Sequence, residues 1–139
     1  DNGNDGIPSQ NHPDNEKLKY DGHFHDSKLL WALGNYSRFV RPGMVRVNVL
    51  LDDGNDLYQQ ARSLMVSAYK NNIADEIVVV AVNYSDDVYD VNINNSERYE
   101  KDVKTYITSE THDLAFFREK IDNLKIAPRS VKTIILKIR

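Results

Sequence analysis

The spacing of apolar residues defines the first element of this chain. Leu29, Leu33, Tyr36 and Val40 recur every three or four positions, which is the spacing of one face of an α-helix. Leu30 and Phe39 widen this stripe. The pattern therefore predicts an amphipathic helix over Ser27–Val40.

Both ends of this helix carry suitable residues. Asp26 or Ser27 can cap the start, because a short side-chain oxygen accepts a hydrogen bond from an unpaired backbone N–H. Pro42 and Gly43 end it, since proline has no N–H and glycine allows the chain to turn. After Gly43 the apolar period becomes two, which is strand periodicity: Val45, Val47 and Val49.

The rest of the chain has strand character. Polar turns separate six short apolar segments, which predicts an antiparallel β-sandwich of Greek-key, immunoglobulin-like type. The continuous apolar run Ile77–Val82 predicts a central strand covered on both faces. In the last strand we expect Ile134, Leu136 and Ile138 to face the core, and we expect a short helical turn within Ala115–Asp122. The predicted strands are Met44–Leu50, Ser63–Lys70, Ile77–Asn83, Val88–Ile93, Val103–Ser109 and Val131–Ile138.

Composition restricts the partners and the organisation. The 139 residues suffice for one domain with its own core. Residues 1–25 are polar and predict a flexible arm, residues 26–43 hold the helix, and residues 44–139 form the sandwich. The net charge of −3 gives no electrostatic reason for nucleic acid binding, and no run approaches the length of a membrane helix. Cysteine is absent, which excludes disulfides and thiolate chemistry.

Two phrases in the chain resemble glycoside hydrolase family 30. Residues 36–43, YSRFVRPG, are similar to the phrase that ends the last barrel helix in that family, before the chain enters a β-sandwich. Residues 127–133, APRSVKT, are similar to a phrase late in that sandwich. Three further segments lie in the order that the family uses: SAYK at 67–70, the strand Ile77–Asn83 with Tyr84 and Ser85 after it, and YIT at 106–108. The resemblance spans residues 27–139, and the sequence is most similar to bacterial endo-β-1,6-galactanase-like members of the family.

The resemblance implies a piece of a larger enzyme. Family members are retaining hydrolases of β-linked glycans with two catalytic glutamates on earlier barrel strands, and nothing here matches those strands. It follows that this chain alone is non-catalytic and stabilises its own (β/α)8 barrel, which is the expected partner beside the polysaccharide substrate of the parent. The resemblance also implies a secreted, periplasmic or cell-surface bacterial protein. The alternative is a free-standing carbohydrate-binding or cell-surface interaction sandwich.

No glutamate of this chain is assigned a catalytic role. Retaining glycosidases place two carboxyl groups about 5 Å apart, and a barrel presents them at strand ends. The glutamates here lie in polar loops or beside basic residues: Glu16, Glu76, Glu97, Glu100, Glu110 and Glu119.

Three segments contain metal-ligating residue types. Residues 1–6, DNGNDG, resemble a calcium loop, but Gly3 occupies a ligand position and His12 stands where a glutamate belongs. His23 and His25 could begin a zinc site, yet no third ligand has a suitable spacing. Residues 52–56, DDGND, could bind calcium, although a solvated hairpin turn is the better interpretation. We therefore expect neither a metal nor any other cofactor.

Aromatic and apolar side chains supply the remaining candidates. Sugar rings pack on aromatic faces, and Tyr58, Tyr89 and Tyr99 lie in or near turns, where they could contact carbohydrate. The stripe of the helix needs a partner, so we expect it to pack between domains. The residues assigned to that packing are Leu29, Trp31, Leu33, Tyr36 and Val40.

Overall fold

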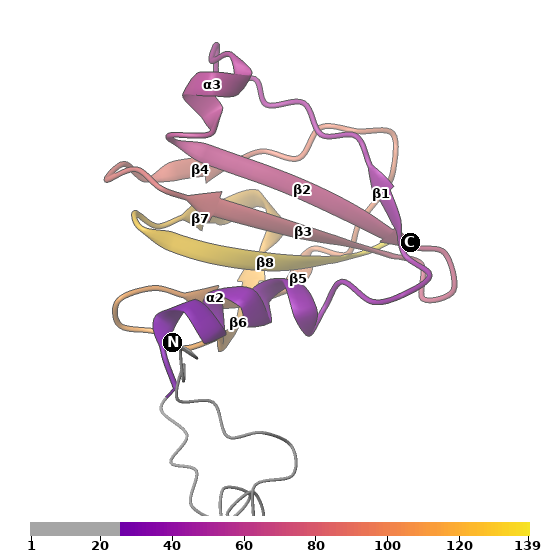
Figure 1. Ribbon diagram of the computed structural model, residues 1–139. Helices are drawn as coiled ribbons and strands as arrows, with labels where there is room; N and C mark the ends of the chain where they lie inside the picture. The colour runs from indigo at the N-terminus through magenta and orange to yellow at the C-terminus, as the bar shows by residue number, and fades with distance from the viewer. Residues whose placement is uncertain (1–25) are drawn as a thin grey trace, which may run out of the picture.

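The computed structural model describes residues 26–139 (Figure 1). The predicted flexible arm lies outside the described residues, and so do the two N-terminal metal candidates with His12, His23 and His25 and the glutamate Glu16.

The described chain is a β-sandwich. Its larger sheet has six antiparallel strands in the order β1-β2-β3-β8-β5-β6, and its smaller sheet pairs β4 with β7. The large sheet contains β1 (Val45–Val47), β2 (Leu64–Asn71), β3 (Glu76–Asn83), β5 (Asp102–Thr108), β6 (Ala115–Lys120) and β8 (Ser130–Lys137). The small sheet contains β4 (Tyr89–Val91) and β7 (Leu124–Ile126). The prediction of an antiparallel β-sandwich with one amphipathic helix in front of it is confirmed.

The main core lies between the two sheets. Alternate residues of β3 and β8 enter it, since Ile77 is opposite Leu136 and Val79 is opposite Ile134 in the ladder. Leu124 and Ile126 of β7 cover them from the small sheet and are almost fully buried. As predicted, Ile134 and Leu136 are buried and Ile138 packs against the same cluster.

The other face of the large sheet carries helix α2 (Lys28–Ser37). It lies over β8 and β5, on the side of the sheet away from β4 and β7 (Figure 1). The Ser27 hydroxyl accepts a hydrogen bond from the backbone N–H of Leu30, which confirms Ser27 as the cap. The helix ends three residues before the predicted Val40, and Gly43 then adopts a φ of +90°, where glycine is favoured.

Two predicted elements are wrong. Residues 115–120 form strand β6 and not a helical turn, because Ala115 to Lys120 pair along β5; only Ile121–Asn123 form a 3₁₀ turn (η1). The acidic segment 52–56 is not a hairpin turn, because it leads into the short helix α3 (Leu57–Gln60). Asp56 caps α3 in a reciprocal arrangement with Gln59.

Candidate functional site

Helix α2 is attached to the sheet by a polar side chain. Asn35 is fully buried, and its Nδ2 donates to the carbonyl of Tyr106 at 3.1 Å and to Oγ1 of Thr133 at 3.0 Å. Its Oδ1 accepts from the Thr108 hydroxyl at 2.7 Å, and the Thr133 hydroxyl donates to its backbone carbonyl at 2.8 Å. Every polar group of this buried contact therefore has a partner, which fixes the rotation of the helix about its own axis.

The fixed rotation turns three leucines away from the sheet. Leu29 is 79% exposed, Leu33 is 60% exposed and Leu30 is 40% exposed. Residues four apart lie one above the other on a helix, so Leu29 and Leu33 form a continuous apolar surface. We call Leu29, Leu30 and Leu33 the apolar helix face. A contiguous exposed apolar surface of this kind is typical of an interaction site.

The other residues assigned to interdomain packing are partly used within the chain. Tyr36 is half-buried, and its hydroxyl lies 3.1 Å from Oγ of Ser67 on β2. Trp31 is half-buried, and its indole N–H donates to Asp26 at 3.1 Å. Val40 is half-buried in the turn after the helix. The structure thus groups Leu29 and Leu33 outward, and it turns Tyr36 towards β2.

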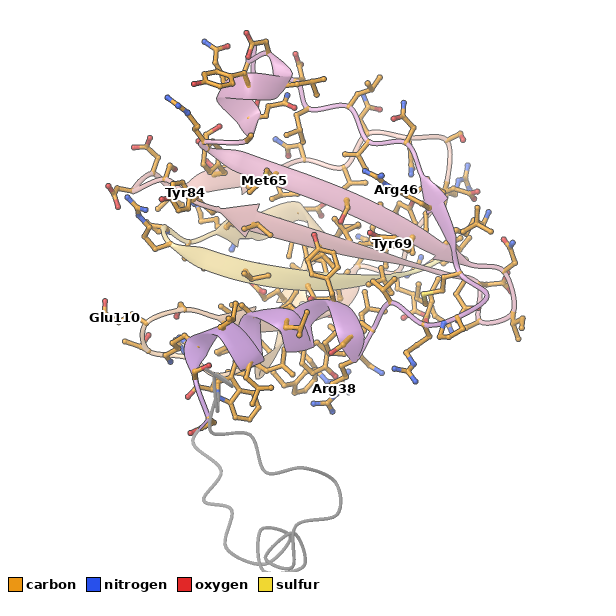
Figure 2. The ribbon with its side chains drawn as sticks, in the orientation of Figure 1. Arg38, Arg46, Met65, Tyr69, Tyr84 and Glu110 are labelled. Carbon is orange, nitrogen blue, oxygen red and sulfur yellow. The ribbon has the colours of Figure 1, made fainter. Side chains whose placement is uncertain are left out.

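The half of the sheet beside the apolar helix face is covered by α2 only in part, where Tyr36 reaches Ser67. The helix contacts β5 and β8, whereas β1 and β2 present Arg46, Met65 and Tyr69 on the same face (Figure 2). Met65 is 39% exposed. The apolar helix face and this open part of the sheet are therefore available to one partner.

The three tyrosines proposed for carbohydrate contact do not come together. Tyr58 lies on α3, is 65% exposed and stacks with Arg62 at 4.4 Å from ring centroid to guanidinium. Tyr89 and Tyr99 are half-buried against the core, and Tyr99 pairs with Ile138 at the opposite end of the sheet from α3. They form no common platform for a sugar.

A small hollow lies at the first turn of α2. Its volume is about 290 Å³, and Lys28, Ala32, Tyr84 and Glu110 are among its walls. Its two basic groups are paired, since Lys28 binds Asp113 at 2.5 Å and Arg129, also in its wall, binds Asp86 at 2.9 Å. The Arg129 guanidinium holds the pKa of Asp86 below its usual value. Nothing in this hollow has the arrangement of a catalytic carboxylate pair.

Several acidic side chains elsewhere have local partners. Glu119 binds the buried Lys132 at 2.7 Å, and Glu97 lies 3.5 Å from Lys70. Asp53 accepts from the backbone N–H of Asn55 and from Gln60, and these hydrogen bonds lower its pKa. Within residues 26–139 no group of three or more His, Asp or Glu side chains is arranged to hold a metal ion.

Sequence reasoning missed Asn35 and Lys132, two polar residues that the fold buries almost completely. A signal for Asn35 existed, because Trp31, Ala32 and Phe39 share its side of the helix and mark a second, sheet-facing stripe. Lys132 carried no such signal, since it lies in an alternating strand where a lysine normally faces water.

Comparison with solved structures identifies proteins with this arrangement of strands. A conserved exported protein from Bacteroides fragilis superposes with a TM-score of 0.75 and 32% identity over 91% of this chain. An endoxylanase of glycoside hydrolase family 30 from Clostridium papyrosolvens superposes with a TM-score of 0.63 and 22% identity over 79% of the chain. The chain shares its fold with part of a family 30 hydrolase. A family 30 subfamily 8 xylanase from Clostridium acetobutylicum gives a TM-score of 0.62 and 21% identity over 81%.

The chain spans about a quarter of the length of each of these proteins, 25% of the exported protein and 28% of each xylanase. Both named activities are on xylan, so the structures support the family's fold and not its galactanase-like branch. No protein-family model matches the chain. Within the described part of the chain, no helix is long and apolar enough to cross a membrane.

Proposed function

We propose that this chain is the C-terminal, non-catalytic part of a larger glycoside hydrolase related to family 30. In this proposal α2 is the last helix of a (β/α)8 barrel, and the sandwich packs against that barrel and stabilises it. The main support for the proposal is that α2 has two different sides. One side is attached to the sheet through Asn35, and the other side exposes Leu29 and Leu33.

The exposed leucines give the expected contact its energy. Burying a leucine side chain that is now mostly in water would contribute about 1 to 2 kcal/mol. Met65 on the open part of the sheet would add to the same interface. A barrel that presents an apolar surface to this region would therefore hold the two parts together without any covalent cross-link other than the chain itself.

The proposed parent acts on a β-linked glycan with retention, using two strand-end glutamates that lie outside this chain. Its proposed location is outside the cytoplasm, which agrees with the description of the Bacteroides fragilis protein as exported. The fold alone does not select the glycan substrate of the parent. The related structures are xylanases, whereas the sequence resembles β-1,6-galactanases more closely.

The decisive experiment uses the longer protein that this chain would belong to. We expect the reading frame to encode a barrel with two strand-end glutamates, and we expect the longer protein, but not residues 1–139 alone, to hydrolyse xylan, β-1,6-galactan or β-glucan. Measurable turnover by the 139-residue chain itself would overturn the non-catalytic role. A reading frame without a barrel would overturn the whole proposal.

The interface is tested by substitution. In the longer protein, Leu29→Lys together with Leu33→Lys should separate the thermal unfolding of barrel and sandwich and shorten the half-life of activity. Ile73→Lys is the matched control, because Ile73 is 98% exposed in a loop between β2 and β3. If both variants behave alike, the apolar helix face does not contact the barrel.

A further inference from the structure

Aromatic rings and cations gather on the other side of α2. The rings of Phe39 and Tyr106 lie 4.3 Å apart between centroids, and those of Tyr106 and Phe116 lie 5.3 Å apart. The guanidinium of Arg38 is 5.5 Å from the Tyr106 centroid, and that of Arg118 is 5.9 Å from the Phe116 centroid. Phe116 is 49% exposed, so the row of rings opens to solvent at β6.

The strand register adds a third cation. Lys104 on β5 lies directly opposite Arg118 on β6, on the same face as Tyr106 and Phe116. Like charges at directly opposed positions destabilise a sheet. Neither Lys104 nor Arg118 forms a salt bridge within residues 26–139. The carboxylate of Asp102, on the same face, is bound to Lys120 at 2.5 Å. We call Arg38, Phe39, Lys104, Tyr106, Phe116 and Arg118 the aromatic–cationic patch.

This patch is separate from the apolar helix face. Arg38 follows Leu29 by nine positions, and at about 100° per residue the two side chains leave the helix on opposite sides. Figure 2 shows Arg38 below α2, whereas Met65 and Tyr69 lie above it. A partner that covers the apolar helix face therefore leaves the aromatic–cationic patch open.

We propose that the aromatic–cationic patch binds an acidic saccharide, a chain that carries uronic acid carboxylates. Sugar rings would pack on Phe116 and Tyr106, and their carboxylates would accept hydrogen bonds from Arg38, Arg118 or Lys104. An anion between Lys104 and Arg118 would also relieve their mutual repulsion, which explains why both charges stand opposite each other.

The choice of a saccharide over other anions rests on the proposed function, since a domain of a glycoside hydrolase encounters polysaccharide. Charge supports the same choice. The whole chain carries −3, which disfavours a long polyanion such as nucleic acid, whereas a short uronate chain needs only a few local cations.

The test titrates the full 139-residue chain with a short oligogalacturonate and, in parallel, with its methyl-esterified form of equal length. We expect binding of the acidic form by calorimetry or NMR, weaker binding at higher salt, and an affinity at least about tenfold lower for the ester, because charge-assisted hydrogen bonds are lost. Phe116→Ala and Arg118→Ser should each weaken binding by about tenfold.

The controls use the same side-chain types elsewhere. Phe117→Ala removes a ring from the opposite face of β6, and Arg62→Ser removes an arginine that stacks on Tyr58; both should bind as the unmodified chain does. Arg118→Ser should leave the thermal midpoint unchanged or raise it, which separates loss of binding from loss of folding.

Three results would overturn the proposal. These are equal binding of the acidic and esterified saccharides, equal binding of single-stranded DNA or polyphosphate, and no binding of any of them. None depends on a barrel, so the patch can fail while the proposed function stands. If the patch binds but no barrel is encoded, the chain is instead a free-standing carbohydrate-binding sandwich.

Discussion

At the scale of single residues, Asn35 sets the orientation of α2. Its amide and backbone carbonyl connect the helix to β5 and β8 through Tyr106, Thr108 and Thr133. A leucine at this position would also be buried, but without directed hydrogen bonds the helix could rotate and slide on the sheet. The amide permits only one orientation, and that orientation exposes Leu29 and Leu33.

We predict that Asn35→Ala lowers the free energy of unfolding by about 3 kcal/mol, because the buried Thr108 hydroxyl loses its acceptor and the Tyr106 carbonyl and Thr133 hydroxyl lose the amide donor. Urea denaturation measures this change. Asn92→Ala, at an exposed position beside β4, is the control and should change stability by less than about 0.5 kcal/mol. A loss below about 1 kcal/mol for Asn35→Ala would show that the network contributes little.

The sequence indicates a second stripe that includes Asn35, but it does not predict the hydrogen bonds that Asn35 makes. A polar residue inside an amphipathic pattern normally faces water, and its partners lie between 71 and 98 residues away. Helical periodicity describes one side of an element, and α2 has two sides in use. Of the predicted stripe, Leu29 and Leu33 face outward, Tyr36 turns towards β2, and Val40 lies beyond the end of the helix. The side that docks on the sheet was not identified.

At the scale of elements, Lys132 connects the two layers of the sandwich. It points into the core from β8, with its side chain 3% exposed. Its ammonium donates to the carbonyl of Lys125 on β7 at 2.8 Å and lies 2.7 Å from Glu119 on β6. Glu119 also accepts from the Thr105 hydroxyl on β5. One cation thus joins four strands.

We predict that Lys132→Met lowers the free energy of unfolding by about 2 to 3 kcal/mol, because the half-buried Glu119 loses its ion-pair partner and the carbonyl of Lys125 loses its donor. Adding Glu119→Gln should recover part of that loss, since the second change removes the unpaired charge. A double-mutant cycle measured by chemical denaturation gives the coupling between them. Strictly additive losses would mean that the pair is not coupled.

The strands were predictable to different degrees. The long ones, β2, β3, β5 and β8, agree with their predicted bounds within one or two residues, because apolar runs between polar turns specify them. Strand β6 was missed, since AFFREK has no strand alternation and only its pairing with β5 makes it a strand. Strand β7 was missed because its three residues are too few to show a period.

At the scale of the whole molecule, ion pairs on the surface connect segments that are distant in sequence. Asp86 binds Arg129 between two loops, and Asp102 binds Lys120 between β5 and β6. The hydrogen bond and charge of Arg129 lower the pKa of Asp86, and those of Lys120 lower the pKa of Asp102. Both carboxylates ordinarily titrate near 3.8.

These shifts set the direction of the pH dependence. A carboxylate whose pKa is lower in the folded state stabilises the fold above its unfolded pKa, and that contribution disappears as the pH falls through the folded value. We therefore predict that the thermal midpoint falls as the pH drops below the ordinary carboxylate value of 3.8. The double variant Asp86→Asn, Asp102→Asn should have a lower thermal midpoint at neutral pH, and that midpoint should fall less on acidification. An identical acid response of the variant would exclude these pairs as its cause.

The attachment of α2 also determines when it can form its native contacts. The helix precedes every strand of the described chain, yet three of its partners, Tyr106, Thr108 and Thr133, belong to strands near the other end. Contacts between residues this distant in sequence form slowly, because the entropy cost of closing a long loop comes before the contact contributes any stabilising energy. During synthesis, Asn35 leaves the ribosome almost a hundred residues before Thr133. Through that interval the sheet-facing side of α2 is uncovered as well as the apolar helix face, and a chaperone or a neighbouring domain can bind the helix.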